Sequence, residues 1–253
     1  MNAALWIGTS FKMNKTRAQA VAYAARLREA VGAGIPGVQP FVLPSATALA
    51  EVTAALGPER TVLTGVQNAH WASAGAWTGE LSVPQAADAG AAIVEIGHSE
   101  RRAHFAETDA TVRLKVEAVL RHGLTPLVCC GESAEDFARG RSVDRVLEQV
   151  AAAFDGIGGT GRALVAYEPV WAIGEHGRAP RPEEIAPVHR ALAEEWGDRT
   201  AGVLYGGSVT PANAPELLMV PGVGGLFAGR SAWRVEGYLA LLEAGRAHLA
   251  PAG

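Results

Sequence analysis

The segment ALVAYEPVWAIG, residues 163–174, joins five apolar residues of strand length to a glutamate and a proline. Pro169 ends the strand because proline has no N–H to donate to a β-ladder. Glu168 is therefore placed at the end of a buried strand, beside the apolar side chains of Trp171 and Ile173. Apolar walls disfavour the ionised form of a carboxyl group, and this makes its carboxylate a stronger base. The segment predicts a buried strand that carries a general base at its carboxyl end.

Short apolar segments like this one recur along the chain, with helical stretches between them. Strands that are apolar throughout are typical of parallel sheets covered on both faces. Two of the intervening stretches carry a helical stripe of apolar side chains. In residues 16–31 the stripe comprises Ala20, Tyr23, Ala24, Leu27 and Val31. In residues 111–120 the inward-facing side chains are Val112, Val116, Val119 and Leu120. The eight apolar segments are residues 5–8, 41–43, 62–66, 92–96, 126–129, 163–167, 202–205 and 225–228.

Eight successive β-then-α units in about 250 residues match the size of a (β/α)8 barrel. A doubly wound open sheet is the alternative, but the Gly-x-Gly-x-x-Gly fingerprint is missing after the first strand. No linker or low-complexity tract divides the chain. We therefore predict an α/β protein with a single catalytic barrel domain over residues 1–253.

Composition excludes several classes of partner. The net charge is −4 and Lys/Arg residues form no block, so we expect no nucleic acid and no membrane surface as partner. No apolar run approaches the roughly 18 residues that a membrane span needs. Cys129 and Cys130 are adjacent, which makes a disulfide between them strained and indicates reduced thiols in the cytoplasm. No spacing is typical of metal ligands, and we expect neither a metal nor an organic cofactor.

Polar and glycine-rich clusters fall directly after the predicted strands. In a barrel these positions meet at one face, the face that carries the chemistry. The clusters are residues 10–14, 67–71, 97–102, Glu168, 206–208 and 229–231.

Four of these regions resemble, in order along the chain, the signature segments of the triosephosphate isomerase family: residues 8–14, 95–102, 166–174 and 204–209. The resemblance implies a TIM barrel in which Glu168 is the base, His98 a neutral electrophile and Lys12 a cation in the site. It also implies that Glu100 is a supporting carboxylate. A structural role, in which it holds Lys12 in a buried pair without exchanging protons with the substrate, suits Glu100 better than a chemical one. The backbone positions that bind phosphate in the family correspond to Gly174, Ser208, Gly229 and Arg230.

Three departures from the family pattern concern the substrate. Ser10 stands where the family has Asn, and Arg230 replaces the second glycine of the last phosphate turn. The lid after Gly174 reads EHGRAP instead of a Thr-Gly-Lys type sequence and is one residue longer. Residues 8–16 and 229–233 resemble a subgroup associated with tetrulose phosphates, which interconverts L-erythrulose 1-phosphate and D-erythrulose 4-phosphate. Ser10 is smaller than Asn, and this fits a substrate with one additional hydroxymethyl group.

The chemistry expected of the family explains why these groups occur together. Moving a carbonyl to its neighbouring carbon passes through an enediolate, so one base must reach both carbons while donors hold both oxygens. A lid between Trp171 and Pro180, which includes Glu175, His176 and Gly177, would exclude water and prevent loss of the phosphate. Such closure and the neutral histidine are known features of triosephosphate isomerase, in line with the resemblance.

Ordinary structural roles are the alternative for each residue taken singly. Taken alone, Glu168 could equally be a glutamate that forms an ion pair at the end of a strand. His98 could be a histidine at the start of a helix, and Lys12 a solvated lysine. A phosphate-binding lyase would need a Schiff-base lysine, for which Lys12 is the only candidate. His70 and Trp71 suit interface packing better than catalysis. We place four further histidines at the surface: His104, His122, His189 and His248.

The loop over residues 67–80 carries two tryptophans among small residues, which is typical of an element that buries itself in a partner. In the family this loop docks into the other subunit, with Thr78 at the matching position, so we expect a homodimer. The expected activity is a sugar-phosphate isomerase acting on L-erythrulose 1-phosphate. The alternatives are isomerisation of dihydroxyacetone phosphate to D-glyceraldehyde 3-phosphate, or a barrel that binds a sugar phosphate without catalysis.

Overall fold

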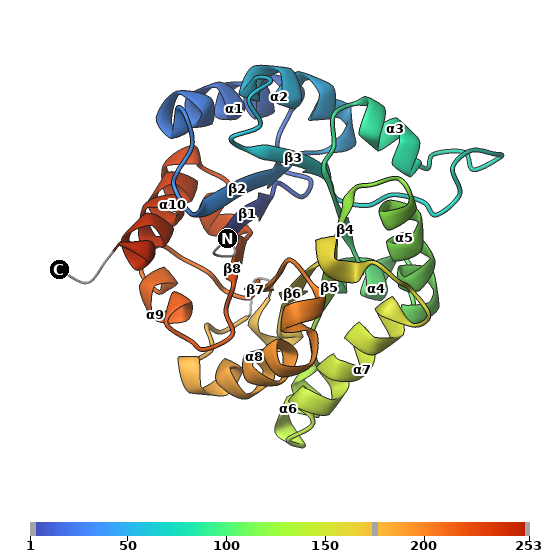
Figure 1. Ribbon diagram of the computed structural model, residues 1–253, viewed down its shortest axis with the longest axis vertical. Coiled ribbons are helices and arrows are strands. Elements are labelled where there is room, and N and C mark those ends of the chain that lie inside the picture. Colours follow the sequence, from blue (N-terminus) through green and yellow to red (C-terminus); the bar gives the residue numbers. More distant parts are fainter. Residues whose placement is uncertain (1–3, 174–176, 251–253) are drawn as a thin grey trace.

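Eight parallel strands form a closed barrel with helices around it in the computed structural model, which describes residues 4–173 and 177–250 (Figure 1). Each strand pairs with the next in sequence, and β8 pairs with β1 to close the barrel. The predicted (β/α)8 barrel is confirmed, with small shifts at the strand ends. The strands are β1 Leu5–Ser10, β2 Val38–Leu43, β3 Leu63–Val66, β4 Ile93–Ile96, β5 Thr125–Cys130, β6 Leu164–Tyr167, β7 Gly202–Tyr205 and β8 Gly225–Ala228.

Helices connect the strands and form the outer layer of the barrel (Figure 1). Nothing among them, within the described part of the chain, combines the length and the apolar character that crossing a bilayer requires. The α-helices are α1 Arg17–Val31, α2 Leu49–Leu56, α3 Val83–Asp88, α4 Ser99–His104, α5 Asp109–Arg121, α6 Ala134–Ala138, α7 Ser142–Phe154, α8 Pro182–Trp196, α9 Ala214–Leu218 and α10 Val235–Leu249. Short 3-10 turns are η1 Ala46–Ala48, η2 Thr160–Arg162, η3 Val170–Ala172, η4 Gly197–Arg199 and η5 Arg230–Ala232.

The core has two parts, because each strand is covered on both faces. The larger part lies between strands and helices, and the buried side chains of α1 are the five predicted from its stripe. The smaller part fills the barrel interior with residues such as Phe41, Ile93, Leu127 and Leu164. Gly8 is required there because a Cβ on it would lie 2.0 Å from the ring of Phe41.

His189 is fully buried, so its predicted place at the surface is wrong. It belongs to the inward stripe of α8, and its ring packs against those of Tyr167 and Tyr205, with centroids 5.5 and 5.9 Å away. Burial lowers its pKa to about 4, so the ring is neutral at physiological pH. The spacing from Ile185 and Val188 to Leu192 would have revealed this face of the helix. The other three histidines are exposed as predicted.

Candidate active site

Glu168 lies directly after β6, at the carboxyl end of the barrel. Its N–H donates to Cys130 O over 2.7 Å, which extends the β5–β6 pairing by one residue, and its side chain is nearly fully buried. Gly206 lies against it so closely that a Cβ there would be 2.7 Å from Glu168 Cγ. Burial, followed by repulsion from Glu95, raises the pKa of Glu168 to about 8. The predicted dry setting of this carboxyl group is therefore present.

Of the two apolar neighbours expected beside Glu168, Ile173 lines the cavity above it and Trp171 does not. The indole of Trp171 packs against Phe137 instead, with ring centroids 4.5 Å apart. Its N–H donates to Glu132 Oε1 over 2.8 Å. Trp171 is thus anchored at the outside of the site.

His98 forms the N-cap of α4, directly after the turn at Gly97. Its Nδ1 accepts a hydrogen bond from the Glu100 N–H over 3.1 Å, so in the neutral ring the hydrogen is on Nε2. Burial, followed by the charge of Lys12, lowers the pKa of His98 to about 4. The imidazole is therefore neutral, and its Nε2 lies 3.6 Å from Glu168 Oε2.

Lys12 follows β1 with a left-handed backbone, φ 49°, which is uncommon for a residue with a side chain. Its Nζ lies 2.6 Å from Glu100 Oε1, as the expected pairing requires. The expectation that this pair is buried is wrong, because the lysine and glutamate side chains are 25% and 49% exposed. The pair lies at the rim of the cavity, where solvent reaches the carboxylate.

The predicted residues surround one cavity of about 840 Å³ at the carboxyl ends of the strands. Ser10, Lys12, His98, Glu100 and Glu168 line one part of it. The turns after β7 and β8 line the same cavity with Gly206, Gly207, Ser208, Gly229, Arg230 and Ser231.

The glycine turns after β7 and β8 provide a niche suited to an anion. Ser208 and Gly229 donate their N–H groups to no acceptor among the described residues, so these groups can serve a bound anion. Arg230 begins the 3-10 turn η5 beside them. The side chain of Ser208 is engaged elsewhere, since its Oγ donates to Ala172 O over 2.6 Å.

The predicted lid is described only at its two ends. Gly174, Glu175 and His176 lie outside the described residues. Gly177 lines the cavity and packs on Ala172, where a Cβ would come within 2.5 Å of the carbonyl carbon. Arg178 next to it places its guanidinium 4.5 Å from the ring centre of Trp171 and forms two hydrogen bonds to Glu184.

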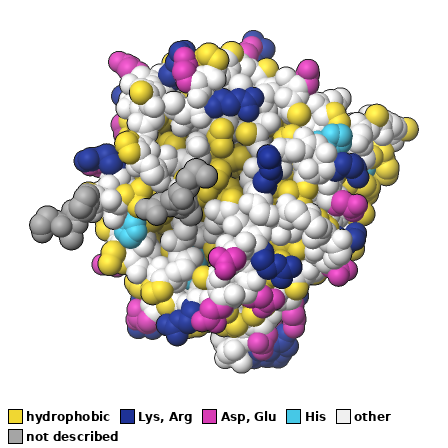
Figure 2. All heavy atoms as spheres, viewed as in Figure 1, with side chains coloured by type: hydrophobic (Ala, Val, Ile, Leu, Met, Phe, Trp, Pro, Cys, Tyr) yellow, Lys and Arg dark blue, Asp and Glu magenta, His cyan; other side chains and the backbone are white. Residues whose placement is uncertain are grey.

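The segment between β3 and α3 projects away from the barrel (Figure 1). His70 stacks on Trp71 with ring centroids 4.0 Å apart and packs at a tilt on Trp77 at 4.2 Å, so that the three rings form a small aromatic cluster in this segment. Trp77 is 49% exposed, and Thr78 next to it is exposed too. Hydrophobic side chains gather on this projection in Figure 2, whereas basic and acidic side chains intermix over the rest of that face.

Two buried carboxyl groups near the site, Glu95 and Glu132, were not predicted. Glu95 lies on β4 and accepts a hydrogen bond from Ser10 Oγ over 3.0 Å. Glu132 accepts from Tyr167 and Trp171. The signal for Glu95 was available, since a glutamate in an otherwise apolar strand of a parallel sheet is exceptional.

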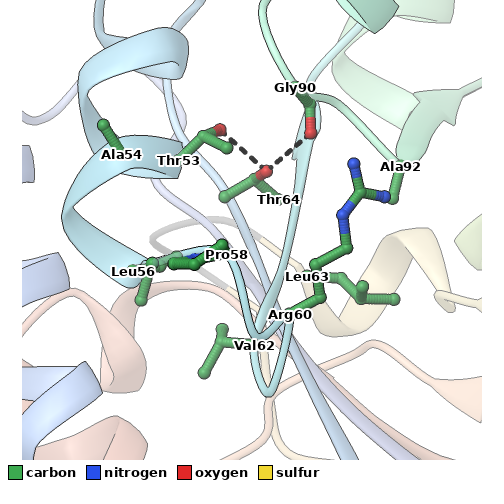
Figure 3. Close-up of a pocket in the computed structure, with 11 residues that line it drawn as sticks. Thr53, Ala54, Leu56, Pro58, Arg60, Val62, Leu63, Thr64, Gly90 and Ala92 are labelled. Carbon is green, nitrogen blue, oxygen red and sulfur yellow. Dashed lines mark hydrogen bonds between the residues drawn. The ribbon is translucent and has the colours of Figure 1, made fainter.

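A second cavity of about 400 Å³ lies at the opposite face of the barrel, near the amino ends of β3 and β4 (Figure 3). Its polar side chains are satisfied locally: Thr53 bonds to Thr64, and Thr64 donates to Gly90 O. Arg60 is the one charged side chain among its lining residues. Within the described ranges, no three His, Cys, Asp or Glu side chains are grouped so that they could hold a metal ion.

Comparison with known proteins places this geometry in context. The family model described as triosephosphate isomerase matches residues 5–245. The chain is 57% identical to L-erythrulose-1-phosphate isomerase of Mycolicibacterium smegmatis, over 97% of this chain and 95% of that protein. It is 50% identical to the Rhizobium etli protein of the same name, over 94% and 91% of the two chains. Its fold is similar to the crystal structure of triosephosphate isomerase from Bartonella henselae, with TM-score 0.85, 31% identity, and 95% and 98% of the chains covered.

Proposed function

The chain belongs to the triosephosphate isomerase family, and we propose that it interconverts L-erythrulose 1-phosphate and D-erythrulose 4-phosphate without a cofactor. The relatives that are 57% and 50% identical over nearly their whole length carry this activity in their names, which supports this substrate over a triose phosphate. The site supports the reaction class independently, because it places a buried carboxyl group beside a neutral imidazole and an ammonium.

Glu168 is the base in this proposal. It removes the proton from C3 of L-erythrulose 1-phosphate, and the electron pair of the broken C–H bond moves into an enediolate across C2 and C3. The same carboxyl group then returns a proton to C2, while the hydroxyl proton passes from O3 to O2 by way of His98 Nε2, which leaves the carbonyl at C3 and a hydroxyl at C2. His98 Nε2–H, which the 3.6 Å separation keeps free of a hydrogen bond to Glu168, donates to the enediolate oxygens, and Lys12 stabilises their negative charge.

The phosphate group occupies the niche of the β7 and β8 turns, with the N–H groups of Ser208, Gly229 and Arg230 as donors. Gly174 is the further donor that the family pattern implies. The lid between Trp171 and Pro180 covers this niche, and Glu175, His176 and Gly177 belong to it. Closure excludes water, and an enediolate next to a phosphate needs this protection, since it otherwise eliminates the phosphate.

One observation carries the proposal: Glu168, His98 and Lys12 line a single cavity together with the anion niche. The test is turnover of L-erythrulose 1-phosphate and dihydroxyacetone phosphate by the purified protein, compared by kcat/KM. A higher value for dihydroxyacetone phosphate would refute the tetrulose substrate in favour of the triose. No turnover of either substrate would favour a barrel that binds sugar phosphate without catalysis.

Three further features belong to the proposal. Residues 1–253 act as one catalytic domain. The projecting segment between β3 and α3, with the exposed Trp77 and Thr78, inserts into a second copy of the chain, so that the enzyme is a homodimer. The enzyme works in the cytoplasm, where the adjacent thiols of Cys129 and Cys130 stay reduced.

A further inference from the structure

Glu95 points into the barrel interior, where a carboxyl group is expensive to bury. Ile93, two residues earlier on β4, belongs to the apolar cluster inside the barrel, and side chains two apart in a strand point to the same face. The side chain of Glu95 is 3% exposed. Removing a charged group from water costs several kcal/mol unless partners offset it. Glu95 therefore calls for an explanation that general packing does not provide.

The one side chain that bonds to Glu95 among the described residues is Ser10. The Ser10 hydroxyl donates to Glu95 Oε2 over 3.0 Å. Ser10 ends β1, and β1 does not pair with β4, so this bond crosses the barrel interior. Ser10 lines the cavity and Glu95 does not, which places the serine between the carboxyl group and the substrate.

The direction of this bond determines what Ser10 offers the substrate. A serine hydroxyl has one hydrogen and two lone pairs. Because Glu95 takes the hydrogen, Ser10 Oγ is left as an acceptor toward the cavity. Burial raises the pKa of Glu95 to about 7, but a carboxyl group retains an oxygen that accepts the serine hydrogen in both protonation forms.

The four-carbon substrate differs from the three-carbon one by a hydroxymethyl group on the reacting carbon. Its hydroxyl needs an acceptor when it leaves water, since an unpaired buried hydroxyl costs about 1–3 kcal/mol. Ser10 lines the same cavity as Glu168 and His98, the two groups that meet the reacting carbons in the proposed reaction, and its partner Glu95 is near enough to Glu168 to raise the pKa of that group.

We propose that Ser10 Oγ accepts a hydrogen bond from the terminal hydroxyl of the four-carbon substrate, and that Glu95 is the positioning residue that holds Ser10 as an acceptor. This inference rests on the proposed function and adds the residue pair that determines its selectivity for the four-carbon over the three-carbon substrate. Glu95 touches no substrate atom, and its effect on the selectivity between the two substrates is exerted through Ser10.

The test is a double-mutant cycle that reads the ratio of kcat/KM for L-erythrulose 1-phosphate to that for dihydroxyacetone phosphate. We expect Ser10→Ala and Glu95→Leu each to lower this ratio about tenfold, the loss of one hydrogen bond. The ratio for the double variant should be no lower than that for Ser10→Ala, because both changes remove the same contact. The ratio cancels any effect of Glu95 on the basicity of Glu168, since both substrates meet the same base.

Thr9→Val is the matched control. Thr9 precedes Ser10 on β1, is fully buried and has an Oγ1 without a hydrogen-bond partner in the described residues, so its change leaves the ratio unaltered. Thermal unfolding is measured for every variant.

Three outcomes would overturn the inference: an unchanged ratio in Ser10→Ala, an equal loss on both substrates in Glu95→Leu, or additive losses in the double variant. Failure of the unmutated protein to convert L-erythrulose 1-phosphate would refute the proposed function instead, before any variant is compared.

Discussion

His98 Nε2 lies 3.6 Å from Glu168 Oε2, and both side chains are nearly fully buried. This separation exceeds that of a hydrogen bond, so the imidazole hydrogen is not consumed by the carboxylate. Burial raises the pKa of the acid and lowers that of the imidazole. The two groups thus meet as a strong base and a neutral donor, the combination that proton transfer at carbon requires.

Replacing Glu168 by Gln tests the base directly. Glutamine keeps the size of the side chain but cannot accept a proton from carbon, so we expect kcat to fall by about 10²–10⁴-fold. The measurement is turnover of L-erythrulose 1-phosphate. Glu243→Gln, an exposed glutamate paired with Arg246, is the control and should behave as the unmutated enzyme. Turnover that survives unchanged in Glu168→Gln would eliminate this mechanism.

The pH dependence of kcat/KM should reflect the raised pKa of Glu168. The base must be ionised, so activity should be lost as pH falls through about 8. Glu95 repels the ionised form and raises this pKa, together with burial and Glu100, whereas Lys12 lowers it. Glu95→Gln removes a negative charge, and we expect the acidic limb to move to lower pH. If the acidic limb of the kcat/KM profile lay at the same pH in Glu95→Gln as in the unmutated enzyme, coupling between the two carboxyl groups would be excluded.

The features of this site that the sequence predicted are those encoded within single segments of the chain. Glu168, His98 and Lys12 each follow a strand, and parallel strands bring such positions together, so their shared cavity was predictable. The exposure of the Lys12–Glu100 pair was not, because it depends on where two side chains 88 residues apart meet in the folded barrel. The bond from Ser10 to Glu95 joins residues 85 apart in sequence and required the closed barrel.

Replacing Glu95 by Leu should also change the dependence of stability on pH. The pKa of Glu95 is about 7 in the folded state against 4.5 in a free side chain, so the folded state binds the proton more tightly. Its contribution to stability is therefore complete below about pH 4.5 and is lost as pH rises through about 7. The leucine variant has no ionisable group at this position, so it does not lose stability in this way as pH rises. We expect the Tm of Glu95→Leu minus that of the unmutated protein to increase between pH 5 and pH 8, and a constant difference would contradict the buried carboxyl.

A charge on the projecting segment between β3 and α3 should test the homodimer. Thr78 is exposed beside the aromatic cluster of His70 and Trp77. An arginine at this position would place an unpaired charge in the proposed interface, so we expect Thr78→Arg to be monomeric in sedimentation equilibrium and to lose turnover. Glu29→Arg, on the exposed face of α1, should leave both unchanged. A monomeric unmutated protein would refute the interface outright.

Lys12 allows catalysis and stability to be separated. Its left-handed backbone is strained by about 1–2 kcal/mol in a residue with a side chain, and glycine removes this strain while adding freedom to the unfolded chain. Its partly exposed ion pair with Glu100 contributes at most about 1 kcal/mol. We therefore expect Lys12→Gly to change Tm little and to lower kcat/KM at least about 100-fold, because the cation is lost.

Arg60 offers a matched control for this change. It has φ 53° and lines the cavity at the opposite face of the barrel, so Arg60→Gly makes the same backbone change far from the chemistry. The kcat/KM of Arg60→Gly should equal that of the unmutated enzyme. If Lys12→Gly kept full activity, or lost stability and activity in proportion, the ammonium of Lys12 would have no part in stabilising the enediolate.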